Sequence, residues 1–108
     1  MSTPSSQNSF APTVAVVGAT GLVGETVLRV MEERGFPVGE LLALGSARSV
    51  GGRVRFRGHS HSVRVAEPAA LRGARLVFFA ATGELSRTLA PAAIEGGAIV
   101  IDKSSTWR

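Results

Sequence analysis

Cysteine is absent from this chain of 108 residues. Without a thiol, the chain can form no disulfide, no thiolate metal site and no cysteine nucleophile. The absence also fits a reducing compartment, so we expect a cytoplasmic protein. Long apolar runs are lacking as well, because no stretch approaches the roughly 20 residues that span a bilayer, and the N-terminal residues do not resemble an export signal. We expect no membrane partner.

Lysine is nearly absent: Lys103 is the only lysine among the twelve basic residues, and the net charge is +4. A positive chain suits an anionic partner such as a nucleotide, a phosphorylated substrate or nucleic acid. The arginines are spread along the chain, which makes nucleic acid the least favoured of the three. The densest basic stretch contains Arg53, Arg55, Arg57, His59, His61 and Arg64.

The two histidines in this basic stretch are poor candidates for a metal site. They are separated by one residue, and neither cysteine nor a close acidic residue accompanies them. We predict a solvated strand face there and no metal site.

Length and composition predict a single compact domain, because 44% of the residues are hydrophobic and the chain is too short for two ordinary domains. Residues 1–12 are rich in Ser, Pro, Asn and Gln and lack the apolar surface that offsets ordering entropy. We predict a disordered tail over residues 1–12 and a domain over residues 13–108.

Apolar patterning from residue 13 onward indicates alternating strands and helices. The run 14–17 predicts a strand buried on both faces, and 41–44, 76–79 and 98–101 predict further strands. Helical spacing appears in two sets of residues: Val23, Val27, Val30 and Met31, and then Leu85, Leu89 and Ile94.

Residues 50–67 alternate differently and predict an exposed hairpin or meander between the two halves of this pattern. The order strand, helix, strand, excursion, strand, helix, strand is typical of the α/β class. It predicts a Rossmann-like, doubly wound fold with a mostly parallel sheet.

Three glycines follow the first predicted strand directly and open the first predicted helix: Gly18, Gly21 and Gly24. Glycine at such positions allows a sharp turn, close approach of the backbone to a pyrophosphate, and tight packing of helix on strand. The N-terminus of the helix then faces the phosphates. This context predicts a dinucleotide-binding loop, with a tight turn that binds nothing as the alternative.

The second predicted strand ends in Gly45, Ser46, Ala47, Arg48 and Ser49. Domains that prefer NAD usually carry an acidic residue here, which binds the ribose hydroxyls. A carboxylate would repel a 2′-phosphate, whereas a guanidinium with neighbouring hydroxyls would bind one. The sequence therefore predicts NADP as cofactor. The alternative is that Arg48 is an exposed loop arginine that binds no ligand.

Four segments resemble the N-terminal part of the aspartate-semialdehyde dehydrogenase family: VAVVGATGLVG at 14–24, SARSVG at 46–51, LVFFAATGELS at 76–86 and VIDKSSTWR at 100–108. The resemblance implies specific site residues. Those against the NADP pyrophosphate would be Thr20, Gly21, Leu22 and Val23; those at the 2′-phosphate would be Arg48 and Ser49; those near the nicotinamide would be Ala81, Thr82 and Gly83. Arg108 would bind the phosphate of the substrate.

This chain departs from the family pattern at two places. Lys103 replaces the usual asparagine, and Ala81, Thr82 and Gly83 replace the commoner Ala-Gly-Gly. The resemblance therefore implies nicotinamide placement less firmly than pyrophosphate binding.

The resemblance also implies an activity, the NADPH-dependent reductive dephosphorylation of β-aspartyl phosphate in lysine, threonine and methionine biosynthesis. In this family a cysteine nucleophile and an acid–base histidine lie in a later domain, which also makes most of the oligomer contacts. We therefore expect a chain truncated before the catalytic and dimerisation domain, inactive alone and homo-oligomeric at full length. No catalytic residue is assigned, and neither His59 nor His61 matches the family's histidine.

Three alternatives remain open from the sequence. N-acetyl-glutamyl-phosphate reductase has a similar glycine loop and the same acyl-phosphate chemistry, although SARSVG and SSTWR favour the aspartate enzyme. A non-catalytic NADP-binding module would explain the lack of a cysteine. A basic domain that binds nucleic acid would make the glycine loop merely structural.

Overall fold

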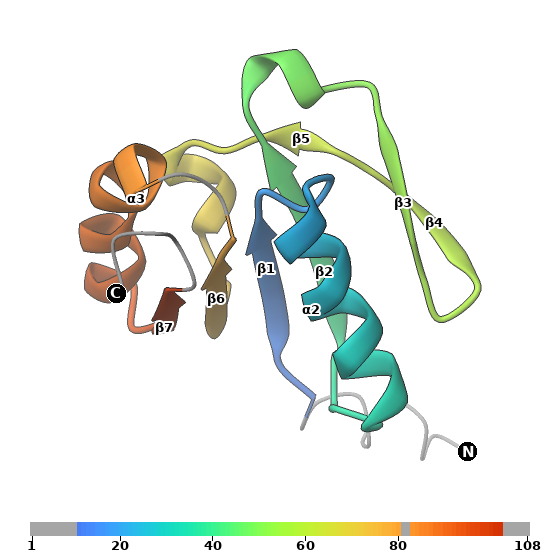
Figure 1. Cartoon of the computed structure of the whole chain (residues 1–108). Coiled ribbons are helices and arrows are strands. Elements are labelled where there is room, and N and C mark those ends of the chain that lie inside the picture. The colour runs from blue at the N-terminus through green and yellow to red at the C-terminus, as the bar shows by residue number, and fades with distance from the viewer. Residues whose placement is uncertain (1–10, 81–82, 103–108) are drawn as a thin grey trace.

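The computed structural model describes residues 11–80 and 83–102, and its centre is a five-stranded sheet (Figure 1). The strands lie in the order β5-β2-β1-β6-β7, and each neighbouring pair is parallel. They are β1 (Thr13–Val17), β2 (Glu40–Gly45), β5 (Arg64–Val65), β6 (Leu76–Phe79) and β7 (Ile99–Asp102). Strand β1 lies in the middle of the sheet. Strands β2 and β5 follow on one side of it, and β6 and β7 follow on the other. This topology confirms the predicted doubly wound α/β fold.

Strand β1 is buried on both faces, as its unbroken apolar run predicts. Val14 and Val16 pack in one core with α2 (Leu22–Glu33), while Ala15 and Val17 pack in a second core with α3 (Gly83–Glu95). All four side chains are 0% exposed. Because successive strand residues point to opposite faces, the two helices cover opposite sides of the sheet.

Helix α2 is rotated relative to the sequence prediction. The expected stripe is confirmed at Met31, which is buried, but Val23 and Val30 are 43% and 40% exposed, and Leu28 is buried in their place. The rotation follows from Gly24, which is buried against the turn after β1. Residues 28 and 31 lie one and two turns beyond Gly24 on the same face, so they point into the sheet.

Helix α3 shows a similar shift of its buried face. Leu89 and Ala93 are buried, whereas Ile94, which the sequence pattern places on the inner face, is 60% exposed. Pairs three and four residues apart share a helix face, and Ser86, Leu89 and Ala93 form such a row. The helix itself, which the spacing of these apolar residues predicts, begins at Gly83 and ends at Glu95.

The excursion between the two halves contains an antiparallel hairpin of β3 (Arg53–Phe56) and β4 (His59–Ser62). The expectation of an exposed hairpin is wrong for one face, because Val54 and Phe56 are 8% and 3% exposed and belong to the core around α2. The pleat turns alternate residues inward, and α2 offers an apolar surface to cover them. The strand that follows, β5, joins the main sheet beside β2.

The hairpin turn is anchored to the region where α2 ends. Arg57 and Gly58 have φ values of 55° and 80°, as a two-residue hairpin turn requires. The Arg57 backbone N–H donates to the Glu32 carboxylate, and its guanidinium donates to the Phe36 carbonyl oxygen. The guanidinium also lies 5.0 Å from the centre of the Phe56 ring. These contacts fix the tip of the hairpin.

Two short 3-10 helices, η1 (Ala47–Ser49) and η2 (Pro68–Leu71), complete the described chain. Ahead of β1, the Pro12 carbonyl oxygen accepts a hydrogen bond from the Gly39 N–H at 2.7 Å. Residues 1–10 of the predicted tail lie outside the described residues, so that boundary stays a prediction. None of the described helices is both long and apolar enough to cross a membrane.

Candidate functional site

Three chain segments converge at the carboxyl edge of the sheet. The N–H groups of Gly18 and Ala19, just after β1, donate to the Leu44 carbonyl oxygen near the end of β2, at 2.8 and 3.2 Å. The Ala80 N–H, just after β6, donates to the Val17 carbonyl oxygen at 2.8 Å. The ends of β2, β1 and β6 therefore lie side by side where the strand order reverses. Ligands of doubly wound sheets bind at this point.

The three glycines of the loop serve different physical needs. Gly18 has a φ of 89°, a conformation that favours glycine, and it turns the chain out of the sheet. A Cβ on Gly24 would overlap the Gly18 carbonyl oxygen and lie 2.8 Å from the Ala19 Cα, so tight packing requires glycine there. A Cβ on Gly21 would lie 3.6 Å from the Gly18 oxygen, which is ordinary contact. The fold itself therefore does not require Gly21, and its open side is available to a ligand.

The N-terminus of α2 is exposed beside this loop. Gly21 is its N-cap and offers no side-chain hydrogen bond, so the first N–H groups of the helix have no side-chain cap. Thr20 and Val23 are exposed, and Leu22 is 82% exposed. An uncapped helix N-terminus attracts anions through its N–H groups and its dipole. The geometry thus suits the pyrophosphate predicted for residues 18–24.

The turn after β2 lies against the glycine loop. The Ser49 N–H donates to the Ser46 carbonyl oxygen at 2.9 Å, and the Gly52 N–H donates to that of Ser49 at 3.0 Å. A Cβ on Gly52 would lie 3.9 Å from the Cγ2 atom of Thr20, so the turn and the loop are neighbours. The structure therefore brings the predicted 2′-phosphate and pyrophosphate residues to one place.

Arg48 lies on the surface of this turn, in η1. Arg48 and Ser46 are exposed, and Ser49 is half-buried. Within the described ranges, the Arg48 guanidinium has no hydrogen-bond or ion-pair partner. Residues 46–52 also contain no acidic side chain. The positive charge of Arg48 is therefore not neutralised locally.

The expected nicotinamide side is described only in part. Gly83 is the first residue of α3, whereas Ala81, Thr82 and the substrate residue Arg108 lie outside the described residues. Close by, the Ser86 hydroxyl donates to Oδ2 of Asp102 at 2.5 Å. Sequence reasoning missed this pair. Its only signal was that each residue falls in one of the four family-like segments, and a segment does not reveal which residues touch.

Within the described hairpin, the arginines and histidines of the basic stretch do not converge on a second binding site. Arg53 and Arg55 lie on the exposed face of the hairpin, and Arg53 donates to the hydroxyls of Ser60 and Ser62 at 2.7 and 3.2 Å. His61 packs edge-on against Phe56, with 6.4 Å between ring centres. Among the described residues, no group of three or more His, Cys, Asp and Glu could hold a metal ion.

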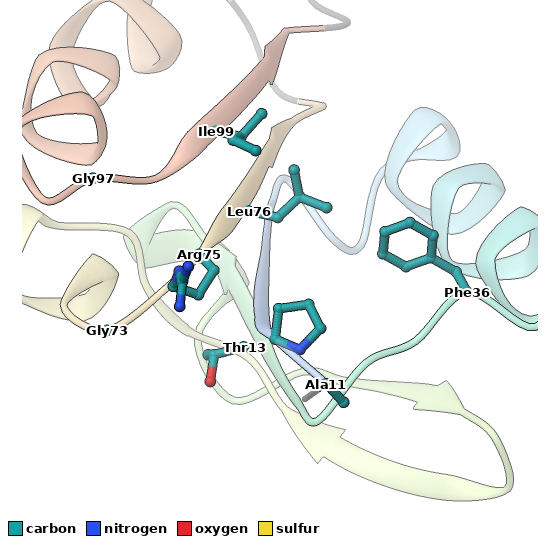
Figure 2. A pocket seen from close by; sticks show the side chains of 9 residues that line it. Ala11, Thr13, Phe36, Gly73, Arg75, Leu76, Gly97 and Ile99 are labelled. Carbon is teal, nitrogen blue, oxygen red and sulfur yellow. The ribbon is translucent and has the colours of Figure 1, made fainter. Parts of the chain in front are cut away.

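A hollow of about 560 Å³ lies at the other end of the sheet, among the first residues of β1, β6 and β7 (Figure 2). Its lining includes Thr13, Arg75 and Ile99, with Phe36 from the segment after α2. In parallel sheets, ligands bind at the carboxyl ends of the strands, and this hollow lies at the amino ends. We therefore do not assign the dinucleotide to it.

Comparison with known proteins agrees with this geometry. Residues 13–108 match the family described as semialdehyde dehydrogenase, NAD binding domain. Aspartate-semialdehyde dehydrogenase from Bacillus subtilis is 45% identical over 95 residues, which is 88% of this chain and 28% of that protein. Aspartate-semialdehyde dehydrogenase 2 from Vibrio cholerae is 47% identical over the same shares. The reductase alternative is not favoured by these relatives.

Solved structures show the same relationship. The crystal structure of aspartate-semialdehyde dehydrogenase II from Vibrio cholerae, complexed with ASA, has a TM-score of 0.82 and 46% identity over 88% of this chain and 31% of that one. The enzyme from Candida albicans with NADP has a TM-score of 0.66 at 18% identity over 90% of this chain and 30% of that one, which shows a shared fold. The chain spans little more than a quarter of its curated relatives. It belongs to the semialdehyde dehydrogenase family and corresponds to the NAD-binding domain.

Proposed function

We propose that this chain binds NADPH in preference to NADH, as the cofactor-binding part of an aspartate-semialdehyde dehydrogenase. The observation that carries the proposal is the glycine loop. Gly24 is required by the packing of the chain itself, whereas a Cβ on Gly21, beside an uncapped helix N-terminus, would make only an ordinary contact. That difference is expected where a backbone must approach a pyrophosphate closely.

Different described residues bind different parts of the cofactor. The pyrophosphate lies at the N-terminus of α2, against Thr20 to Gly24. The 2′-phosphate is bound by the Arg48 guanidinium together with the hydroxyls of Ser46 and Ser49. This assignment is supported by the contact between the turn after β2 and the glycine loop, and by the lack of acidic side chains in residues 46–52.

The activity proposed for the whole protein is the reduction of β-aspartyl phosphate to aspartate semialdehyde with release of phosphate. When bound, the cofactor supplies the hydride for this reaction. Residues of this chain bind and orient it, and Arg108 binds the phosphate of the substrate. The cysteine nucleophile that such chemistry uses is absent from these 108 residues, so the chain alone is expected to be inactive. Cytoplasmic location and homo-oligomerisation of the whole protein remain predictions.

A titration of the chain with NADPH and with NADH, followed by nicotinamide fluorescence, tests the proposal. We expect wild type to bind NADPH at least tenfold more tightly, since hydrogen bonds to charged groups contribute about 1.5–3 kcal/mol each. Arg48→Ala should remove this preference and leave NADH binding unchanged. Arg72→Ala is the matched control, because Arg72 is exposed and precedes β6, near the amino edge of the sheet. Equal binding of both nucleotides by wild type would contradict the NADPH assignment.

A further inference from the structure

A groove of about 390 Å³ lies between α2 and the sheet, away from the candidate cofactor site. Val23, Val27 and Val30 of α2 line one side of it, and Phe78 of β6 lines the other. Among the described residues that line the groove, Arg34 alone is charged. The groove is therefore an apolar surface that contacts solvent.

The sheet beside this groove is only partly covered. On the face that α2 covers, β6 presents Leu76 and Phe78, and β7 presents Ile99 and Ile101 in register with them. Figure 2 shows Leu76 and Ile99 next to each other, near Phe36. Phe78 and Ile101 are half-buried, and Ile99 is 67% exposed. Of the two described α-helices, α2 covers this face over β1 and β2, and α3 lies on the opposite face (Figure 1).

The handedness of the connections explains why this half of the face is bare. The connection through α2 leads from β1 to β2, and the connection through α3 leads in the opposite direction, from β6 to β7. Opposite directions on opposite faces give the same hand, as the right-handed crossover rule requires. The connection from β5 to β6 also lies on the α3 face, where Leu71 and Ala74 join the core. A strand added beyond β7 would again place its crossover there, so the bare half must be covered by another kind of element.

The sequence of α2 independently indicates that this surface is covered. Val23, Val27 and Val30 recur at helical spacing and form one apolar stripe. Leu28 and Met31 form the stripe that is buried on the sheet, whereas Val23 and Val30 are 43% and 40% exposed. A helix that faces water on one side ordinarily carries polar residues there. A second apolar stripe beside a bare sheet face is expected where another element packs.

We propose that the groove receives the apolar side of one helix, contributed by the part of the whole protein that lies outside these 108 residues. The length of the relatives supports this occupant, because the chain spans 28% of each of two of them. A helix fits better than a strand, since helices pack side by side on a sheet at 8–10 Å. It would lie beside α2 over β6 and β7, with an acidic side chain near Arg34. The proposal goes beyond nucleotide binding and requires no cofactor.

The test measures how fast a maleimide reacts with a cysteine placed in the groove. The chain has no cysteine of its own, so Val30→Cys introduces its single thiol. Arg29→Cys is the matched control, because Arg29 is exposed in the same helix and does not line the groove. Each variant is made in the 108-residue chain and in the whole protein, and labelling of α2 is read by mass spectrometry. We expect Val30→Cys to react at least about tenfold more slowly in the whole protein, and Arg29→Cys to change less than about twofold.

A second variant gives an independent measurement that does not depend on thiol chemistry. Val30→Asp should leave the urea midpoint of the 108-residue chain unchanged, because its carboxylate stays in water. In the whole protein it should lower the midpoint by about 1 M or more, because the docked helix would bury an unpaired charge. Equal effects in both proteins would contradict the proposal.

The remaining outcomes also decide the question. Equal labelling of Val30→Cys in both proteins would overturn the proposal, and so would a gene product that consists of these 108 residues alone. Slow labelling in the 108-residue chain that becomes faster on dilution would assign the groove to a second copy instead. Nucleotide titration is a separate readout, so a chain that binds NADPH while its groove stays open in the whole protein would refute this inference and retain the proposed function.

Discussion

Gly24 lies directly against the backbone of Gly18, so that a Cβ on Gly24 would overlap the Gly18 carbonyl oxygen. This contact joins the first turn of α2 to the loop that leaves β1. It explains why the helix buries Leu28 beside Met31 and leaves Val23 and Val30 exposed. It also implies that the glycines of the loop differ in what they contribute to stability and to binding.

Alanine substitutions at Gly24 and Gly21 should have opposite profiles. Gly24→Ala is expected to lower the free energy of unfolding by about 3 kcal/mol, because backbone atoms must move to admit the methyl group. Gly21→Ala should cost about 1 kcal/mol or less, because its Cβ meets only an ordinary contact. Gly21→Ala should nevertheless weaken NADPH binding at least about tenfold, because the backbone there is proposed to approach the pyrophosphate closely. Urea unfolding and fluorescence titration of both variants measure the two effects, and equal losses of stability would contradict the assignment.

An acidic residue at position 48 should reverse the cofactor preference. Arg48→Asp removes the guanidinium proposed to bind the 2′-phosphate and places a like charge beside that phosphate. We expect NADPH affinity to fall by about two orders of magnitude, with NADH binding equal to or better than wild type. Titrations at two ionic strengths provide the check, since the wild-type preference should shrink as salt screens the charge. An unchanged preference would place the 2′-phosphate elsewhere.

The two faces of the β3–β4 hairpin should respond differently to truncation. Phe56 is 3% exposed within the core around α2, so Phe56→Ala is expected to cost about 3–5 kcal/mol of stability. Arg55 lies on the outer face, and Arg55→Ala should change stability by less than about 0.5 kcal/mol. Chemical denaturation of both variants decides the point. Similar small effects would show that the hairpin does not contribute to the core.

Strand β7 should promote self-association of the chain. It stands at one end of the strand order, and Ile99 on it is 67% exposed. An exposed apolar edge favours pairing with another chain. Ile99→Thr keeps a β-branched side chain but lowers its apolarity, so self-association in sedimentation velocity should decrease at nearly unchanged stability. The control is Val100→Thr, which alters a half-buried core residue and should mainly destabilise the chain.

Patterns in the sequence were sufficient to predict the class of fold, and they also led to the candidate site. The apolar run 14–17 indicates a doubly buried strand, and Gly18, Gly21 and Gly24 indicate the turn that follows. The order of strands and helices then implies the parallel topology, because few connections satisfy it. The prediction that Arg48 is a site residue likewise uses only its place after β2. Apart from the order of the elements, these features arise within a few residues of chain.

Only the tertiary structure decided which side chains touch across long separations. The inward face of the hairpin depends on α2, and Arg57 reaches Glu32, which is 25 residues away. Ser86 meets Asp102 across 16 residues because β7 lies beside β6 in register. The rotation of α2 likewise depends on one steric contact rather than on hydrophobic periodicity. The periodicity of apolar residues predicts which segments are helical. Which neighbour covers each residue depends on how the elements pack.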